Sequence, residues 1–63
     1  MNLEKQVYEL ISLETELKRC PQIDPEQQTI VREALKCVSE ENYKTIQGII
    51  ESTKRLINIV HDS

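Results

Sequence analysis

Two cysteines and one histidine have the widest chemical range of any side chains in this chain, and they are too few for a metal site. Cys20, Cys37 and His61 are the only residues of their types. A structural zinc site requires four cysteine or histidine ligands, so the chain lacks a full set. The single glycine excludes a glycine-rich phosphate-binding loop. We therefore predict that the protein binds no metal ion and no cofactor.

The 11 acidic residues also favour a structural interpretation. Most of them fall at expected helix caps, in first turns, or four residues before a lysine or arginine, where a solvated carboxylate is a sufficient explanation. Acid–base catalysis instead requires carboxylates whose pKa is shifted by burial or by a close charge. We predict no catalytic residue, and so we expect that the protein is not an enzyme.

Neither cysteine has a feature that activates a thiol or brings it close to the other. Cys20 follows the first expected helix, away from a helix N-terminus that would stabilise a thiolate. Cys37 lies 12 residues beyond Pro25, which is about 18 Å along a second helix. In a simple hairpin this separation exceeds the reach of a disulfide, about 7 Å between Cα atoms. We expect two reduced thiols and a cytoplasmic protein; a less regular fold that joins them is the alternative.

Charge and hydropathy favour a partner that is neither a membrane nor a nucleic acid. The formal net charge is −3, and it is spread along the chain without a basic patch. Residues 1–6 do not resemble the start of a secretion signal. No stretch approaches the roughly 18 apolar residues of a membrane span.

Hydrophobic periodicity predicts an all-α protein. Only two residues are aromatic, both of them tyrosines, and the apolar side chains are nearly all aliphatic. A helix over residues 2–19 is indicated by apolar residues at steps of three and four: Leu3, Val7, Leu10, Leu13 and Leu17. Pro21 then prevents its continuation.

A second helix over residues 25–38 has a clear start. Asp24 is a good N-cap, Pro25 suits the first helical position, and Gln27 stands where a capping box has its second member. Its apolar side chains span a broad arc of about 160°. This width predicts that the helix is covered on two sides.

A third helix over residues 39–61 follows from Ser39 as a cap and an acidic first turn. Its stripe comprises Tyr43, Ile46, Ile49, Ile50, Thr53, Leu56, Ile57 and Val60. The apolar register slips near residues 38–40, which favours a break there over the alternative of one continuous helix from 25 to 61. We predict a single domain over residues 1–63, either an antiparallel helical hairpin or a three-helix arrangement.

A strip of small side chains on the third helix suggests how the protein works. By the step of about 100° per residue, the strip lies off the core stripe and contains Thr45, Gly48, Ser52 and Ile59. A glycine inside a helix costs about 1 kcal/mol relative to alanine, and close approach of another helix would explain it. An ordinary solvated face is the alternative. Next to the core stripes lie three further interface candidates: Tyr8, Ile11 and Tyr43.

These observations predict a non-catalytic protein–protein interaction module, a small regulator or adaptor that acts through its helix faces. Because three short helices bury limited apolar area, a second subunit would add needed stability. A two-fold contact is the commonest way to supply one. We therefore expect a homodimer at micromolar concentration, with the third helix in or beside the interface. The sequence does not identify any other partner protein.

The alternative is a helix-turn-helix-like, nucleic-acid-binding transcriptional regulator. Ser39 would cap a recognition helix with four polar side chains for base edges: Asn42, Lys44, Thr45 and Gln47. The usual turn glycine is absent, Glu40 and Glu41 stand where this helix would approach phosphate, and the whole chain is acidic. Nucleic acid is therefore the less favoured partner.

Overall fold

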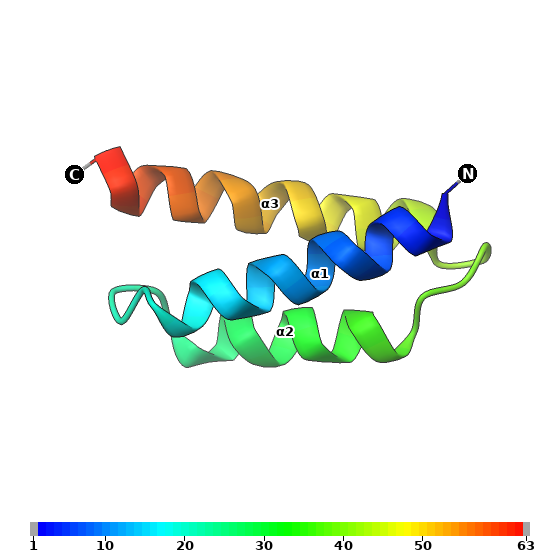
Figure 1. Ribbon diagram of the computed structural model, residues 1–63, viewed down its shortest axis with the longest axis horizontal. Helices are drawn as coiled ribbons and strands as arrows, with labels where there is room; N and C mark the ends of the chain where they lie inside the picture. Colours follow the sequence, from blue (N-terminus) through cyan, green and yellow to red (C-terminus); the bar gives the residue numbers. More distant parts are fainter. Residues whose placement is uncertain (1, 63) are drawn as a thin grey trace.

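The computed structural model of the protein describes residues 2–62, and in them the chain forms three helices: α1 (Leu3–Lys18), α2 (Pro25–Lys36) and α3 (Tyr43–Asp62). The helices run antiparallel to their neighbours in sequence, and each packs against both others in a bundle of 35 × 18 × 16 Å (Figure 1). The predicted all-α class is confirmed, in its three-helix form. The alternative of one continuous helix over 25–61 is wrong.

The ends of α1 are set by local hydrogen bonds. The Asn2 side chain accepts a hydrogen bond from the Lys5 backbone N–H at 2.9 Å, which caps the first turn. At the other end the Arg19 N–H donates to the Glu16 carbonyl at 3.0 Å, and the chain turns towards Pro21. The observed helix thus begins and ends one residue inside the predicted range.

The predicted N-cap of α2 is confirmed, but the capping box is not formed. Asp24 Oδ1 accepts a hydrogen bond from the Glu26 N–H at 3.0 Å, and Pro25 fills the first helical position. The Gln27 side chain instead donates to Thr53 Oγ1 on α3, at 2.9 Å. Helix α2 ends at Lys36, two residues earlier than predicted.

The break between α2 and α3 is longer than the sequence indicates, and Ser39 does not lie directly before α3. Ser39 Oγ accepts from the Asn42 N–H at 3.3 Å, and Asn42 Nδ2 donates to the Cys37 carbonyl at 2.9 Å. The Ile46 N–H then donates to the Asn42 carbonyl at 2.9 Å. Residues 39–42 are therefore a closed turn, and α3 begins four residues later than predicted, because Ser39 caps this turn rather than the helix.

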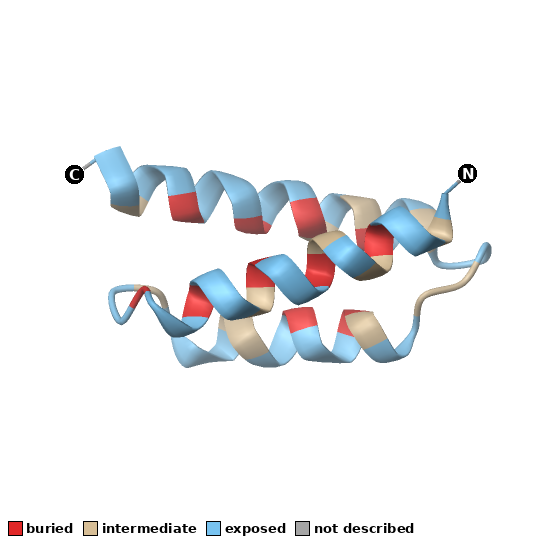
Figure 2. Ribbon diagram, viewed as in Figure 1, coloured by how far each residue is buried: buried red, intermediate tan, exposed pale blue. Residues whose placement is uncertain are grey.

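The core runs along the centre of the bundle, where the buried faces of the three helices meet (Figure 2). It is formed by aliphatic side chains: Leu10, Leu13, Leu17, Val31, Ala34, Ile46, Ile50 and Ile57. Two polar residues, Gln6 and Thr53, are also buried. Gln6 Nε2 donates to the Tyr43 carbonyl at 3.0 Å and to Gln47 Oε1 at 3.2 Å, so it joins α1 to α3.

The two cysteines lie at opposite ends of α2. Cys20 is buried in the connection between α1 and α2, and Cys37 is exposed at the C-terminal end of α2. Figure 1 shows these two connections at opposite ends of the bundle. The geometric prediction that the thiols are too far apart to pair is confirmed. The cytoplasmic location inferred from it stays a prediction.

Candidate functional site

The face of the bundle formed by α2 and α3, turned away from α1, contains an open apolar groove. We call this surface the α2/α3 face. The floor and sides of its groove come from the two helices and the turn between them: Glu26, Thr29, Ile30, Glu33, Ala34, Cys37, Asn42, Thr45, Ile46 and Ile49. Of the three helix pairs, α2 and α3 are the least closely packed. The groove therefore exposes apolar surface that the other helix pairs bury.

Several aliphatic side chains on this face remain accessible to solvent. Ile30 on α2 is 37% exposed, and Leu56 on α3 is 38% exposed. Ile59, one turn further along α3, is 64% exposed. Single exposed aliphatic residues are common on protein surfaces, whereas a contiguous apolar patch with a polar rim is typical of an interaction surface. Glu26 and Glu33 supply such a rim on the α2 side.

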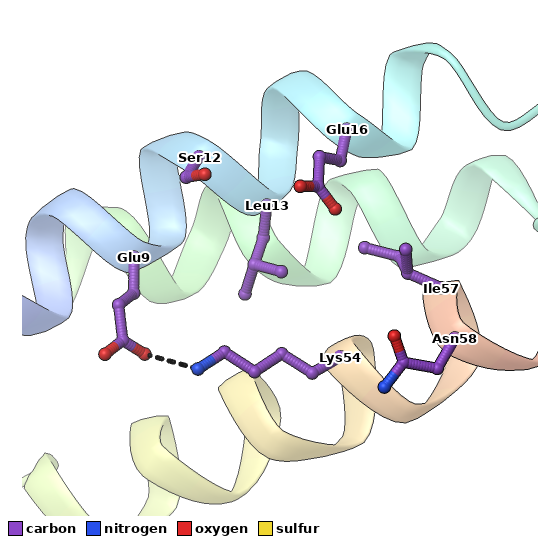
Figure 3. Close-up of a pocket in the computed structure, with 7 residues that line it drawn as sticks. All are labelled: Glu9, Ser12, Leu13, Glu16, Lys54, Ile57 and Asn58. Carbon is purple, nitrogen blue, oxygen red and sulfur yellow. Dashed lines mark ion pairs between the residues drawn. The ribbon is translucent and has the colours of Figure 1, made fainter. Parts of the chain in front are cut away.

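The α1/α3 face has the opposite character, because polar groups bridge it. Its hollow is lined by Glu9, Ser12, Leu13, Glu16, Lys54, Ile57 and Asn58. Figure 3 shows the Lys54 side chain reaching from α3 to Glu9 on α1, where Nζ lies 3.2 Å from Oε2. Of the seven lining residues, only Leu13 and Ile57 are aliphatic. This surface offers less apolar area to a partner than the α2/α3 groove does.

An ion pair also joins α1 to α2. Arg32 Nε donates to Glu14 Oε2 at 3.0 Å. Among residues 2–62, no ion pair joins α2 to α3, and the one side-chain hydrogen bond between them is that of Gln27 with Thr53. The α2/α3 face is thus the only one of the three that no ion pair spans in the described chain.

Gly48 has no packing role within the chain. A Cβ atom built at this position meets nothing within 4 Å, and the residue has no positive φ. Neither space nor backbone conformation therefore requires glycine, although it weakens the helix by about 1 kcal/mol relative to alanine. Both interpretations of the small-residue strip, an ordinary solvated face and close approach of another helix, agree with this open space.

The seven predicted interface residues do not form one surface. Thr45 lines the groove, and Gly48, Ser52 and Ile59 are exposed on the same side of α3, by the step of about 100° per residue. Tyr8 and Ile11 are exposed on α1, and neither lines the α2/α3 groove. Tyr43 is half-buried, and its carbonyl accepts the Gln6 hydrogen bond between α1 and α3. Only the α3 strip belongs to the α2/α3 face.

The sequence pattern assigns Ile30 and Leu56 to the core and gives Glu26 and Glu33 no role in a site. The signal that could have identified Ile30 is the broad apolar arc of α2: the helix packs against α1 and α3 as that width predicts, but Ile30, near one edge of the arc, stays 37% exposed. The acidic rim carries no signal of its own, because Glu26 also reads as a favourable first-turn residue. The position of Glu26 and Glu33 next to an apolar groove follows only from the packing of α2 against α3.

The described residues hold no cluster suited to metal binding. No group of three or more histidine, cysteine or acidic side chains lies close enough within residues 2–62 to hold a metal ion. Two of the four side chains proposed for base recognition are also engaged within the chain. Asn42 bonds to the Cys37 carbonyl, and Gln47 accepts from Gln6.

A comparison with known protein families, curated proteins and solved structures finds no match for this chain. Within residues 2–62, none of the three helices combines the length and the apolar character that crossing a membrane demands.

Proposed function

We propose that the protein is a non-catalytic protein–protein interaction module, a small cytoplasmic regulator or adaptor, and that the α2/α3 face is its binding surface. The observation that carries the proposal is the apolar groove between α2 and α3, which is lined in part by accessible Ile30 and has a rim that includes Glu26 and Glu33. Exposed Leu56 adds apolar surface on α3 outside the groove lining. Burying such a patch against another protein is favourable by about 25 cal/mol per Å² of apolar area.

We also propose that the protein forms a homodimer with α3 in the interface. A chain of 63 residues gains only a few kcal/mol from its own core, roughly 3–5. A second subunit would remove the exposed aliphatic surface of α3 from water. It would also account for Gly48, which nothing within the chain requires.

Nucleic-acid binding has less support. The Asn42 and Gln47 side chains are held by intramolecular hydrogen bonds, and the turn that precedes α3 carries Glu40 and Glu41. Phosphate contacts supply much of the affinity for DNA, and an acidic chain without a basic patch lacks them.

Two experiments test the function. In the first, tagged and untagged copies are co-expressed and the tagged chain is captured. In the second, DNA binding is measured by a DNA-shift assay at about physiological salt. We expect the wild type and the Tyr8→Asp control to retain a bound protein, either the untagged copy or another partner. Leu56→Asp, which places a charge on the α2/α3 face, should lose it while its circular-dichroism spectrum stays helical. Salt-sensitive DNA binding without any bound protein would contradict the proposal.

A further inference from the structure

The α2/α3 face has an acidic flank on α2, in the rim of the groove, and a basic flank on α3, which by the step of about 100° per residue lies past the small-residue strip on the side away from α2. Glu26 and Glu33 are seven residues apart on α2, so they lie on one line along the helix, two turns apart. Lys44 and Arg55 are 11 residues apart on α3, so they share a line three turns long. Arg55 Nη2 donates to Ser52 Oγ at 3.4 Å, which holds the guanidinium beside the small-residue strip.

The shapes of the two helices on this face are complementary as well. Helix α2 presents long side chains there, those of Glu26, Ile30 and Glu33. Helix α3 carries long side chains there too, Ile49 and Leu56, but beside them runs the strip of shorter residues, Thr45 and Ser52 with Gly48 between them. The long side chains of α2 can therefore fill the space above the small residues of a second copy's α3. If α3 packed on α3, the space between the two small-residue strips would stay unfilled.

We propose that the occupant of the α2/α3 face is the same face of a second copy, related by a two-fold axis parallel to the helices. This inference rests on the proposed homodimer and specifies its geometry. Under this symmetry, α2 of each copy lies on α3 of the other, so the acidic flank of one copy meets the basic flank of its partner. The contact is isologous and closed, so it forms a dimer and not a filament.

The register follows from one hydrogen bond. The Gln27 side chain donates a hydrogen bond to Thr53, so we place these two residues at the same height along the bundle axis. At about 1.5 Å rise per residue in antiparallel helices, Glu26 is level with residue 54, about 1.5 Å from Arg55. A two-fold axis parallel to the helices preserves these levels between copies. It thus sets Glu26 of one copy beside Arg55 of the other.

The same heights along the bundle axis give the positions of the other side chains in the dimer contact. Ile30 is level with residue 50, midway between Gly48 and Ser52, about 3 Å along the axis from each. Its side chain would enter the hollow that the small residues leave. Glu33 is level with residue 47, about 4.5 Å along the axis from Lys44 and within the span of a long lysine side chain. Its ion pair with Lys36 at 3.9 Å is exposed and weak enough to exchange.

Charge decides against the other face-to-face symmetry. A two-fold axis perpendicular to the helices would stack α2 on α2 and α3 on α3, in antiparallel pairs. With that axis at the centre of the face, between Glu26 and Glu33, Glu26 would lie opposite the partner's Glu33, and Lys44 would lie near the partner's Arg55. Like charges opposed across an interface are unfavourable and suppress that arrangement.

The test is a charge-reversal cycle on the intact chain, with the dimer dissociation constant measured by sedimentation equilibrium. Glu26→Lys and Arg55→Glu should each weaken the dimer by about tenfold, because each change alters both symmetric contacts. The double variant should recover to within about threefold of the wild type. Glu4→Lys, an exposed first-turn reversal on α1, is the matched control and should leave the dimer unchanged.

A cross-linking experiment separates the two symmetries directly. In a Cys37→Ser background, a mixture of Ile30→Cys and Ser52→Cys chains should form a disulfide-linked dimer under mild oxidation. Either chain alone should remain uncross-linked. Self-linking of Ile30→Cys, or a stronger dimer in Glu26→Lys, would overturn the parallel two-fold. A dimer that ignores every one of these changes would overturn this inference alone, whereas a monomeric wild type would also overturn the proposed homodimer.

Discussion

The α1/α3 face and the α2/α3 face share the same helix, yet they end up with opposite surfaces. Between α1 and α3, Gln6 donates two hydrogen bonds and Lys54 reaches Glu9, so polar groups close the seam above the core. Between α2 and α3 a single side-chain hydrogen bond forms, and an apolar groove stays open. The difference teaches that an aliphatic stripe stays accessible to solvent where the neighbouring helix covers it incompletely.

The largest expected difference between the two faces comes from shortening an aliphatic side chain on each. Leu13, at the base of the α1/α3 hollow, is buried, and Leu13→Ala should cost about 3 kcal/mol of unfolding free energy. Ile49 in the groove is only half-buried, so Ile49→Ala should cost about 1 kcal/mol at concentrations where the chain is monomeric. Urea unfolding followed by circular dichroism measures both. Equal losses would mean that the groove is as well covered as the hollow.

Removing the cation from the closed face should have a moderate effect. Lys54→Met leaves Glu9 Oε2 without its ion-pair partner on α3, and we expect a loss of about 0.5–1 kcal/mol that shrinks at high salt. Lys44→Met, on the same helix but away from Glu9, is the matched control for a folding effect. Both are measured by urea unfolding of the monomer. If Lys44→Met lost more unfolding free energy than Lys54→Met, the Lys54–Glu9 ion pair would not be what stabilises the α1/α3 face.

The smallest expected effect is a gain. Gly48→Ala should stabilise the monomer by about 0.5–1 kcal/mol, because alanine is the better helix former and its Cβ meets nothing within 4 Å. Ser52→Ala, one turn further on, serves as a control at a position with smaller propensity change. Thermal unfolding at low protein concentration measures both. A loss of stability in Gly48→Ala would indicate a packing role for this glycine within the chain.

Much of the fold is predictable from this sequence because its signals are local. The aliphatic stripe of α1, the Asp24–Pro25 start of α2 and the slip in register after α2 each depend on residues a few positions apart. The start of α3 is not predictable in this way. Ser39 and Asn42 are both acceptable caps, and only the hydrogen bond from Asn42 to the Cys37 carbonyl selects the closed turn.

The candidate site is predictable only in part, because it depends on how two helices meet. The strip around Gly48 follows from angular position on one helix and is found in the structure on an exposed side of α3. The hydrogen bonds of Gln6 and Gln27 to α3 do not follow, because an inward-turned glutamine is interpreted from sequence as a surface residue until its distant partner is known. The sequence does place Thr53 in the core stripe, but it does not predict the bond to Gln27. The acidic rim is not predictable either, because its place beside the groove depends on how α2 packs against α3.

The central claim is that the α2/α3 face binds a second copy of the chain and that Gly48 permits the contact. Sedimentation equilibrium of the wild type and of Gly48→Leu over micromolar concentrations tests it most directly. Leucine suits a helix, and its Cβ has open space, so the variant should fold as a monomer while its larger side chain blocks the partner. We predict a wild-type mass of twice the 7.4 kDa of one chain and a Gly48→Leu mass of one chain. A monomeric wild type, or a dimer that Gly48→Leu leaves intact, would contradict the account.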